Sequence, residues 1–148
     1  MKAPRIPRVL LVEDEPGDTR LMQLAMKNSG FQLDLHCVGD GHEAIEYLTR
    51  LGQKSRNAVH PDLILLDLKM PGQSGLETLR AIKQLDSLRA IPVVVVTTSG
   101  LEADVVAAYH LGAAGYVAKP ADLNEFMEAI RLLGTYWFKL VRLPDRTE

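Results

Sequence analysis

Short apolar runs alternate with helical stretches along the whole chain, five times over. Residues 9–12, 63–66 and 92–96 are apolar without alternation, which is typical of strands that are covered on both faces. Each run is followed by a segment in which apolar residues recur every three or four positions, the spacing of an amphipathic helix. Strands that are joined through helices run parallel, with right-handed crossovers. The pattern therefore predicts an α/β fold built on a parallel sheet.

Two weaker segments complete the predicted sheet. Residues 31–37 alternate between apolar and polar side chains, which indicates an edge strand with one face in water. Residues 116–118 form a short apolar run that we expect to be the last strand. Five such strands with helices on both faces favour a doubly wound, flavodoxin-like (βα)5 sheet in the order 2-1-3-4-5, with the uniformly apolar strands in its centre.

Several helices have recognisable starts. Ser74 and Glu77 have the spacing of a capping box, and Asp122 is expected to cap the last helix. The first helix is expected from Asp18 onward. The polar stretch 52–61 is the one long loop that the sequence predicts.

Length, charge and cysteine content narrow the class of protein. A chain of 148 residues fits a single domain, large enough to bury a core without disulfide bonds. A net charge of −2 gives no electrostatic reason to bind nucleic acid or an anionic membrane. The single cysteine, Cys37, fits a reducing compartment, and no apolar run approaches the roughly 18 residues that cross a bilayer. We therefore expect a cytoplasmic protein without direct nucleic-acid or membrane partners.

Chemically useful side chains follow the predicted strands where each strand ends. The set consists of Glu13, Asp14, Asp67, Thr97 and Lys119. In an open parallel sheet, ligands bind outside the carboxyl ends of the strands, where the winding direction reverses between the first and third strands. The topology should therefore bring all five residues to one crevice. Exposure of strand ends to solvent would explain one such residue more readily than all five.

The chemistry of this set indicates a magnesium-dependent phosphoryl site. Three carboxylates close together repel one another, and a hard divalent cation removes that conflict. Oxygen ligands from few protein groups suit Mg²⁺ best. A carboxylate beside Mg²⁺ can attack phosphorus and form an acyl phosphate. Lys119 would neutralise charge on the phosphoryl oxygens, and the Thr97 hydroxyl would donate a hydrogen bond to one of them.

Four segments carry a family resemblance. They read VLLVEDEP, DLILLDLKMPGQSG, IPVVVVTTS and GYVAKP, and their spacing along the chain matches as well. Over about residues 6–135 the chain resembles the receiver domain of two-component response regulators. On this resemblance, residues 1–148 form a single receiver domain, with an aromatic C-terminal tail at 136–148.

The resemblance implies a role for each acidic residue of the set. Asp67 would be the phosphoacceptor, taking its phosphoryl group from a sensor histidine kinase or a phosphotransfer protein. Asp14 would bind Mg²⁺ directly, Glu13 would contribute through a water molecule, and the backbone carbonyl of Lys69 would be another ligand. Glu13 stands where aspartate is commoner, and we interpret the Lys69 side chain as merely solvated. Such a protein catalyses only its own phosphorylation and dephosphorylation, and is not otherwise an enzyme.

The resemblance also implies a switch. Thr97 and Lys119 would hold the phosphoryl group, and Tyr116 occupies the position of an aromatic residue that turns inward when Thr97 moves towards the phosphate. The bond between Lys119 and Pro120 matches one that is cis in the family.

The C-terminal aromatics and the fourth predicted helix suggest an interface. Residues 136–138 are three consecutive aromatics that cannot all face one core stripe. We expect a homodimer through the fourth helix, the fifth strand, the fifth helix and the tail, because large apolar patches are uncommon on monomers. The alternative is that the tail folds back on its own domain. The loop at 52–61 and the tail also resemble receivers that work with bacterial phytochrome-type photoreceptor kinases.

Three other interpretations stay open. Only nine residues follow Lys139, so we expect no output domain, and the fold could serve as a docking module that works without phosphorylation. An aspartate-nucleophile phosphatase also uses Mg²⁺, but it would need a second aspartate where Lys69 stands. Residues 39–44 fit the G-x-G-x-x-A pattern of dinucleotide sites, yet they follow the edge strand, so a turn and helix start explains them better.

Overall fold

A five-stranded parallel sheet forms the centre of the computed structural model, which describes residues 6–54, 60–70 and 72–144. Its order is β2-β1-β3-β4-β5, so the predicted flavodoxin-like topology is confirmed. The strands are β1 (Arg8–Val12), β2 (Asp34–Val38), β3 (Leu63–Leu66), β4 (Val93–Thr97) and β5 (Gly115–Ala118).

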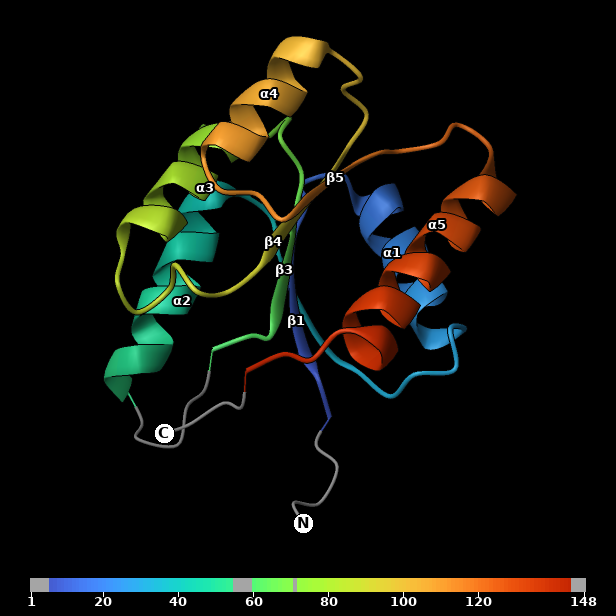
Figure 1. Ribbon diagram of the computed structural model, residues 1–148, viewed down its shortest axis with the longest axis horizontal. Helices are drawn as coiled ribbons and strands as arrows, with labels where there is room; N and C mark the ends of the chain where they lie inside the picture. The colour runs from blue at the N-terminus through green and yellow to red at the C-terminus, as the bar shows by residue number, and fades with distance from the viewer. Residues whose placement is uncertain (1–5, 55–59, 71, 145–148) are drawn as a thin grey trace.

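Helices cover both faces of this sheet (Figure 1). On one face lie α1 (Pro16–Lys27) and α5 (Leu123–Thr135), and on the other lie α2 (Gly41–Lys54), α3 (Gly75–Gln84) and α4 (Glu102–His110). A π-helical turn, η1 (Tyr136–Leu140), continues α5 directly. No helix in the described part of the chain is long and apolar enough to span a membrane.

Two apolar layers explain why residues 9–12, 63–66 and 93–96 of the central strands are all apolar. In β1, Leu10 and Val12 point into the layer under α2, α3 and α4, whereas Val9 and Leu11 point into the layer under α1 and α5. β3 and β4 divide their side chains between the two layers in the same way. β2 lies at the edge and alternates between exposed and half-buried residues, as its sequence predicted. Its ladder begins only at Asp34, three residues later than expected.

The helix starts largely follow the sequence. Ser74 and Glu77 form the predicted capping box, and the Asp122 side chain accepts a hydrogen bond from the Glu125 backbone at the start of α5. α1 begins two residues before Asp18, because Pro16 suits the first helical position. α2 runs to Lys54, so the predicted loop at 52–61 begins later than expected, and its residues 55–59 lie outside the described residues.

Part of the aromatic tail folds back on its own domain. Trp137 and Phe138 pack against the apolar layer under α1 and α5. The ring centroids of Phe138 and Phe31 lie 6.3 Å apart in an edge-to-face arrangement. Tyr136 and Leu140 remain exposed. Trp137 and Phe138 therefore fold back on their own domain, whereas Tyr136 does not.

The bond between Lys119 and Pro120 differs from the expectation. No peptide bond among residues 6–54, 60–70 and 72–144 is cis, so this bond is trans and the expectation of a cis bond is wrong. Trans is the preferred form of most bonds that precede proline.

Gly75, the first residue of α3, permits a close approach to the strand end that carries Asp67. Its backbone N–H donates to the Leu68 carbonyl oxygen at 3.1 Å. A Cβ atom at this position would lie 2.4 Å from the Asp67 carbonyl oxygen and 2.5 Å from the Leu68 Cα atom. Both clashing groups are backbone, so neither can swing away. The start of α3 can pack here only with glycine.

We predict that Gly75→Ala lowers the free energy of unfolding by about 1–3 kcal/mol, because the added methyl group forces the backbone after β3 to shift. Gly100→Ala is the matched control, since a Cβ atom there meets no heavy atom within 4 Å. Urea unfolding followed by circular dichroism measures both variants. Equal stability of the two variants would contradict the steric argument.

Candidate functional site

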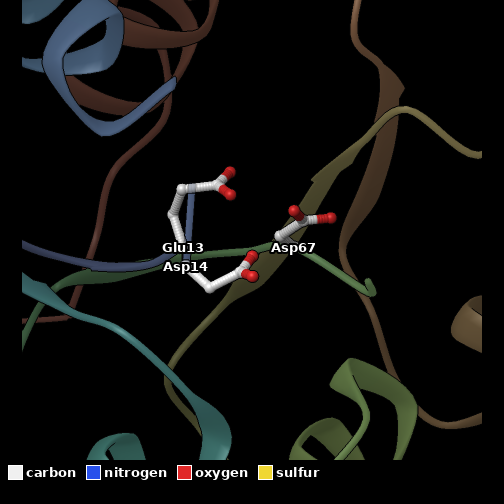
Figure 2. A group of neighbouring side chains, drawn as sticks. All are labelled: Glu13, Asp14 and Asp67. Atoms are coloured by element: carbon white, nitrogen blue, oxygen red, sulfur yellow. The ribbon is translucent and has the colours of Figure 1, made fainter. Parts of the chain in front are cut away.

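Three carboxylates meet at the carboxyl end of the sheet (Figure 2). Glu13 and Asp14 directly follow β1, and Asp67 directly follows the adjacent strand β3. The Asp67 backbone N–H donates to the Val12 carbonyl oxygen at 3.0 Å, which keeps the two strand ends level. One oxygen atom from each carboxylate lies within 4.8 Å of the other two. Glu13 and Asp67 are buried and Asp14 is exposed, so the cluster opens to solvent on one side.

Lys119 brings a positive charge to this cluster from β5, an edge strand of the sheet. It follows β5, and its side chain is only 5% exposed. The Nζ atom lies 2.6 Å from Glu13 Oε1, 2.7 Å from Asp18 Oδ2 and 3.5 Å from Asp67 Oδ2. The sequence-predicted residues Glu13, Asp67 and Lys119 therefore lie together.

Asp18 is a residue of this site that the sequence analysis did not identify. It lies in the first turn of α1 and was used there only to mark the start of a helix. Acidic residues are common in first turns because the helix dipole favours them, so the sequence alone gave little reason to assign Asp18 a further role. The only hint in the sequence was that Asp18 lies a few residues after Glu13 and Asp14, in a chain whose fifth strand is followed by a lysine.

Burial raises the pKa of the Glu13 carboxyl from its ordinary 4.5 to about 7. The hydrogen bond and charge of Lys119 act against this rise, and the nearby Asp67 charge adds to it. Burial alone would lower the pKa of Lys119, but its hydrogen bonds to Asp18 and Glu13 and the charge of Asp67 outweigh burial and raise it. Lys119 is therefore held as a cation, as a counterion for the acidic cluster must be.

Thr97 and Tyr116 meet one loop rather than the carboxylates. Thr97 is fully buried at the end of β4, and its hydroxyl oxygen accepts a hydrogen bond from the Ser99 backbone N–H at 3.4 Å. The Tyr116 hydroxyl donates to the Ser99 carbonyl oxygen at 2.9 Å, and its ring packs against the apolar layer under α2, α3 and α4. The Ser99 hydroxyl in turn donates to Asp104 of α4. The segment between β4 and α4 thus connects Thr97, Tyr116 and α4.

Lys69 lies two residues after Asp67, and its side chain is exposed. Its backbone N–H donates to Asp67 Oδ1 at 3.2 Å, which fixes the orientation of that carboxylate. The exposed side chain agrees with its interpretation as a solvated lysine.

The glycine-containing segment at 39–44 forms hydrogen bonds within itself. The Gly39 backbone N–H donates to the Glu43 carboxylate at 2.5 Å, and the Glu43 backbone N–H donates to Asp40 Oδ1 at 2.8 Å. Side chains of the same segment thus accept hydrogen bonds from backbone N–H groups around the start of α2, as the turn interpretation predicts.

Comparison with known proteins decides the family. Residues 9–131 match the response regulator receiver domain. The chain belongs to this family.

Response regulator Rcp1 of Synechocystis sp. is 40% identical over 136 residues, which are 92% of this chain and 92% of that protein. The crystal structure of the phosphorylated cyanobacterial phytochrome response regulator RcpA superimposes with a TM-score of 0.88 at 38% identity, covering 95% of this chain and all of that one. The Mn²⁺-bound form of Rcp1 superimposes with a TM-score of 0.85 at 39% identity, covering 94% of this chain and 99% of that one. This receiver is therefore similar to phytochrome-associated response regulators along nearly its whole length.

The donor set of this receiver fits a hard divalent cation. All three side chains that converge offer carboxylate oxygen atoms, and the two buried ones share the ammonium group of Lys119. Receiver domains bind a divalent metal, and the Mn²⁺-bound Rcp1 structure is one example among the relatives.

We predict that Glu13 makes the stability of the metal-free protein fall as pH rises from about 4.5 to 7. A carboxyl with a raised pKa keeps its proton in the folded state over this window, whereas the unfolded chain has already released it. Glu13→Gln should remove this fall, which amounts to at most about 3 kcal/mol. Glu102→Gln, at an exposed position on α4, should leave it unchanged. Urea unfolding at several pH values with a chelator present measures the effect, and an identical pH profile for Glu13→Gln and the parent would contradict it.

Proposed function

We propose that this receiver accepts a phosphoryl group on Asp67 from the phosphohistidine of a sensor histidine kinase or a phosphotransfer protein. The observation that carries the proposal is the meeting of Glu13, Asp14 and Asp67 within 4.8 Å, with the Lys119 ammonium 3.5 Å from the Asp67 carboxylate. The family match supports it, because a receiver implies a phosphodonor.

Mg²⁺ is the cofactor of this proposal. Asp14 and Asp67 would hold the ion directly, Glu13 through water, and Lys69 with its backbone carbonyl. When bound, the ion would neutralise the carboxylates and polarise the phosphoryl oxygens. The exposed Asp14 leaves the solvent side of the cluster open for both ion and phosphodonor.

The residues of the chain perform the transfer. An Asp67 carboxylate oxygen attacks the phosphorus atom, the new O–P bond forms, and the P–N bond to the donor imidazole breaks, with the electron pair leaving on nitrogen. Lys119 balances the negative charge of the phosphoryl oxygens, and the Thr97 hydroxyl donates a hydrogen bond to one of them. The protein thereby catalyses only its own phosphorylation and dephosphorylation, and it has no separate substrate.

The output of the proposed switch is the face formed by α4, β5 and α5. A shift of Thr97 towards the phosphoryl group would pull on Ser99, whose backbone already joins Thr97 to the Tyr116 hydroxyl. Tyr116 would thus report the phosphorylation state to α4 through the Ser99–Asp104 hydrogen bond.

The phosphodonor that the comparisons favour is a phytochrome-type photoreceptor kinase. This proposal is supported by the 38% identity with RcpA, which is named a phytochrome response regulator. A histidine kinase would transfer its phosphoryl group in the cytoplasm, where a chain with one free cysteine fits. The net charge of −2 gives no reason to add nucleic acid as a direct partner.

We further propose a homodimer through α4, β5, α5 and the tail. Val106 and Tyr109 of α4, Leu132 of α5, and Tyr136 and Leu140 of η1 are large apolar residues with 47–73% of their surface exposed. α4 contacts β5, and η1 continues α5, so these exposed residues lie on the elements of the proposed face, and large apolar patches are often covered by a partner.

Asp67→Asn should abolish phosphorylation. We expect intact mass spectrometry to detect one added phosphoryl group on the parent protein after incubation with Mg²⁺ and acetyl phosphate, and none on the variant, because the amide oxygen is a far weaker nucleophile. Asp86→Asn, at an exposed position beyond α3, should be phosphorylated like the parent. A parent protein that gains no mass and binds no Mg²⁺ would contradict the proposal and favour a docking module that works without phosphorylation.

Tyr109→Glu should separate the proposed dimer, since it places a charge on the exposed face of α4. Beryllofluoride serves as a mimic of the phosphoryl group on Asp67. In its presence, size-exclusion chromatography with light scattering should give a dimer for the parent and a monomer for the variant. Leu24→Glu, at an exposed position on α1, should remain dimeric. A monomeric parent with and without beryllofluoride would refute this interface.

A further inference from the structure

Asp18 contacts the site lysine from a helix that carries none of the residues assigned to phosphoryl chemistry. Its Oδ2 atom accepts a hydrogen bond from Lys119 Nζ at 2.7 Å. The Asp18 side chain is 30% exposed, whereas the Lys119 side chain is 5% exposed. Asp18 therefore forms the solvent-side wall of the space that holds the ammonium group.

The hydrogen-bonding capacity of Lys119 shows what this contact can do. An ammonium group has three N–H donors. Two of them are used at 2.6 Å on Glu13 and 2.7 Å on Asp18. The remaining carboxylate oxygen, Asp67 Oδ2, lies at 3.5 Å, which is beyond a normal hydrogen bond. Two short contacts thus hold the Nζ atom, and a third N–H donor remains beyond these two, with Asp67 Oδ2 at 3.5 Å.

We propose that Asp18 is a positioning residue that holds the Lys119 ammonium so that its remaining N–H faces the oxygens of a phosphoryl group on Asp67. The inference rests on the proposed function of Asp67 as phosphoacceptor. Glu13 alone is not enough for this task, because the same carboxylate is proposed to serve the cation through water. Asp18 lies outside the cluster formed by Glu13, Asp14 and Asp67, and it stays available to the lysine.

The start of α1 makes Asp18 a firm anchor. Glu15 caps the helix by accepting a hydrogen bond from the Gly17 backbone at 2.9 Å, and Pro16 fixes the backbone of the first turn. The helix dipole also favours a carboxylate in this turn. Lysine, by contrast, has a long side chain with several freely rotating bonds, so an anchored partner removes conformations that point away from Asp67.

A second explanation gives Asp18 no specific role. It would be one more negative charge near the site that helps to attract a cation, or simply a helix-stabilising residue. Glu15 offers the matched control, because it is exposed, belongs to the same helix start and contacts the Gly17 backbone. Glu15→Gln removes one charge near the site and keeps an oxygen that can cap the helix. Asp18→Asn removes one charge and weakens the contact with Lys119.

The test measures the rate of phosphorylation by acetyl phosphate over a series of Mg²⁺ concentrations. For Asp18→Asn we expect the maximal rate at saturating Mg²⁺ to fall about tenfold, because the ammonium is no longer held in place. For Glu15→Gln we expect the maximal rate of the parent. Thermal unfolding confirms that each variant is folded. If Asp18→Asn does not fold, Asp18→Ser replaces it, since serine is also accepted at helix starts.

A readout without phosphoryl transfer accompanies this test. In the metal-free parent, the Lys119 ammonium protons should exchange slowly with water and give a resolved ¹⁵N–¹H NMR signal. The signal should persist in Glu15→Gln and disappear in Asp18→Asn.

The possible outcomes distinguish the role of Asp18 from the proposed function of Asp67. A parent that is phosphorylated together with an Asp18→Asn variant of unchanged maximal rate would overturn the role of Asp18 alone. An equal rise in the Mg²⁺ requirement of both variants, with unchanged maximal rates, would also overturn it. Asp18 would then act only as one more negative charge near the site, as Glu15 does. A parent that is not phosphorylated would overturn the proposed function, and the role of Asp18 with it.

Discussion

The contact between Lys119 and Glu13 is the interaction on which the acidic end of the sheet depends. The two residues are 106 positions apart in sequence, yet Nζ and Oε1 lie 2.6 Å apart with both side chains almost fully buried. A buried carboxylate next to two others is strongly unfavourable unless a charge compensates it. Lys119 supplies that charge. It can do so only because β1 and β5 run parallel, so that their carboxyl ends lie at the same end of the sheet.

The rest of the fold keeps that edge in place. The central strands share their apolar side chains between two layers, so β1 and β3 are held level and deliver Glu13 and Asp67 side by side. Gly75 lets α3 close against the backbone that carries Asp67. The segment after β4 joins Thr97 to Tyr116 through Ser99. Hydrogen bonds thus link Lys119 to Asp18 of α1, and Ser99 to Asp104 of α4.

The sequence predicted the strand order, the edge position of β2 and the convergence of Glu13, Asp14, Asp67 and Lys119, because these follow from periodicity and from the rules of parallel sheets. Thr97, which was expected in the same crevice, contacts Ser99 instead. It did not predict Asp18 as a partner of Lys119, since that contact depends on the direction of two side chains from distant elements. It also left the tail undecided, because only the tertiary packing of η1 shows that Trp137 and Phe138 turn inward while Tyr136 does not.

The proposed phosphoryl chemistry requires that the cluster of carboxylates binds a divalent cation. Isothermal titration calorimetry of the parent protein with Mg²⁺ tests it most directly. We predict one bound ion per chain, and a much weaker affinity for Asp14→Asn, which removes the exposed carboxylate of the cluster while leaving the buried contact of Glu13 and Lys119 intact. A parent that binds no Mg²⁺, or an Asp14→Asn variant that binds it as tightly as the parent, would contradict the account.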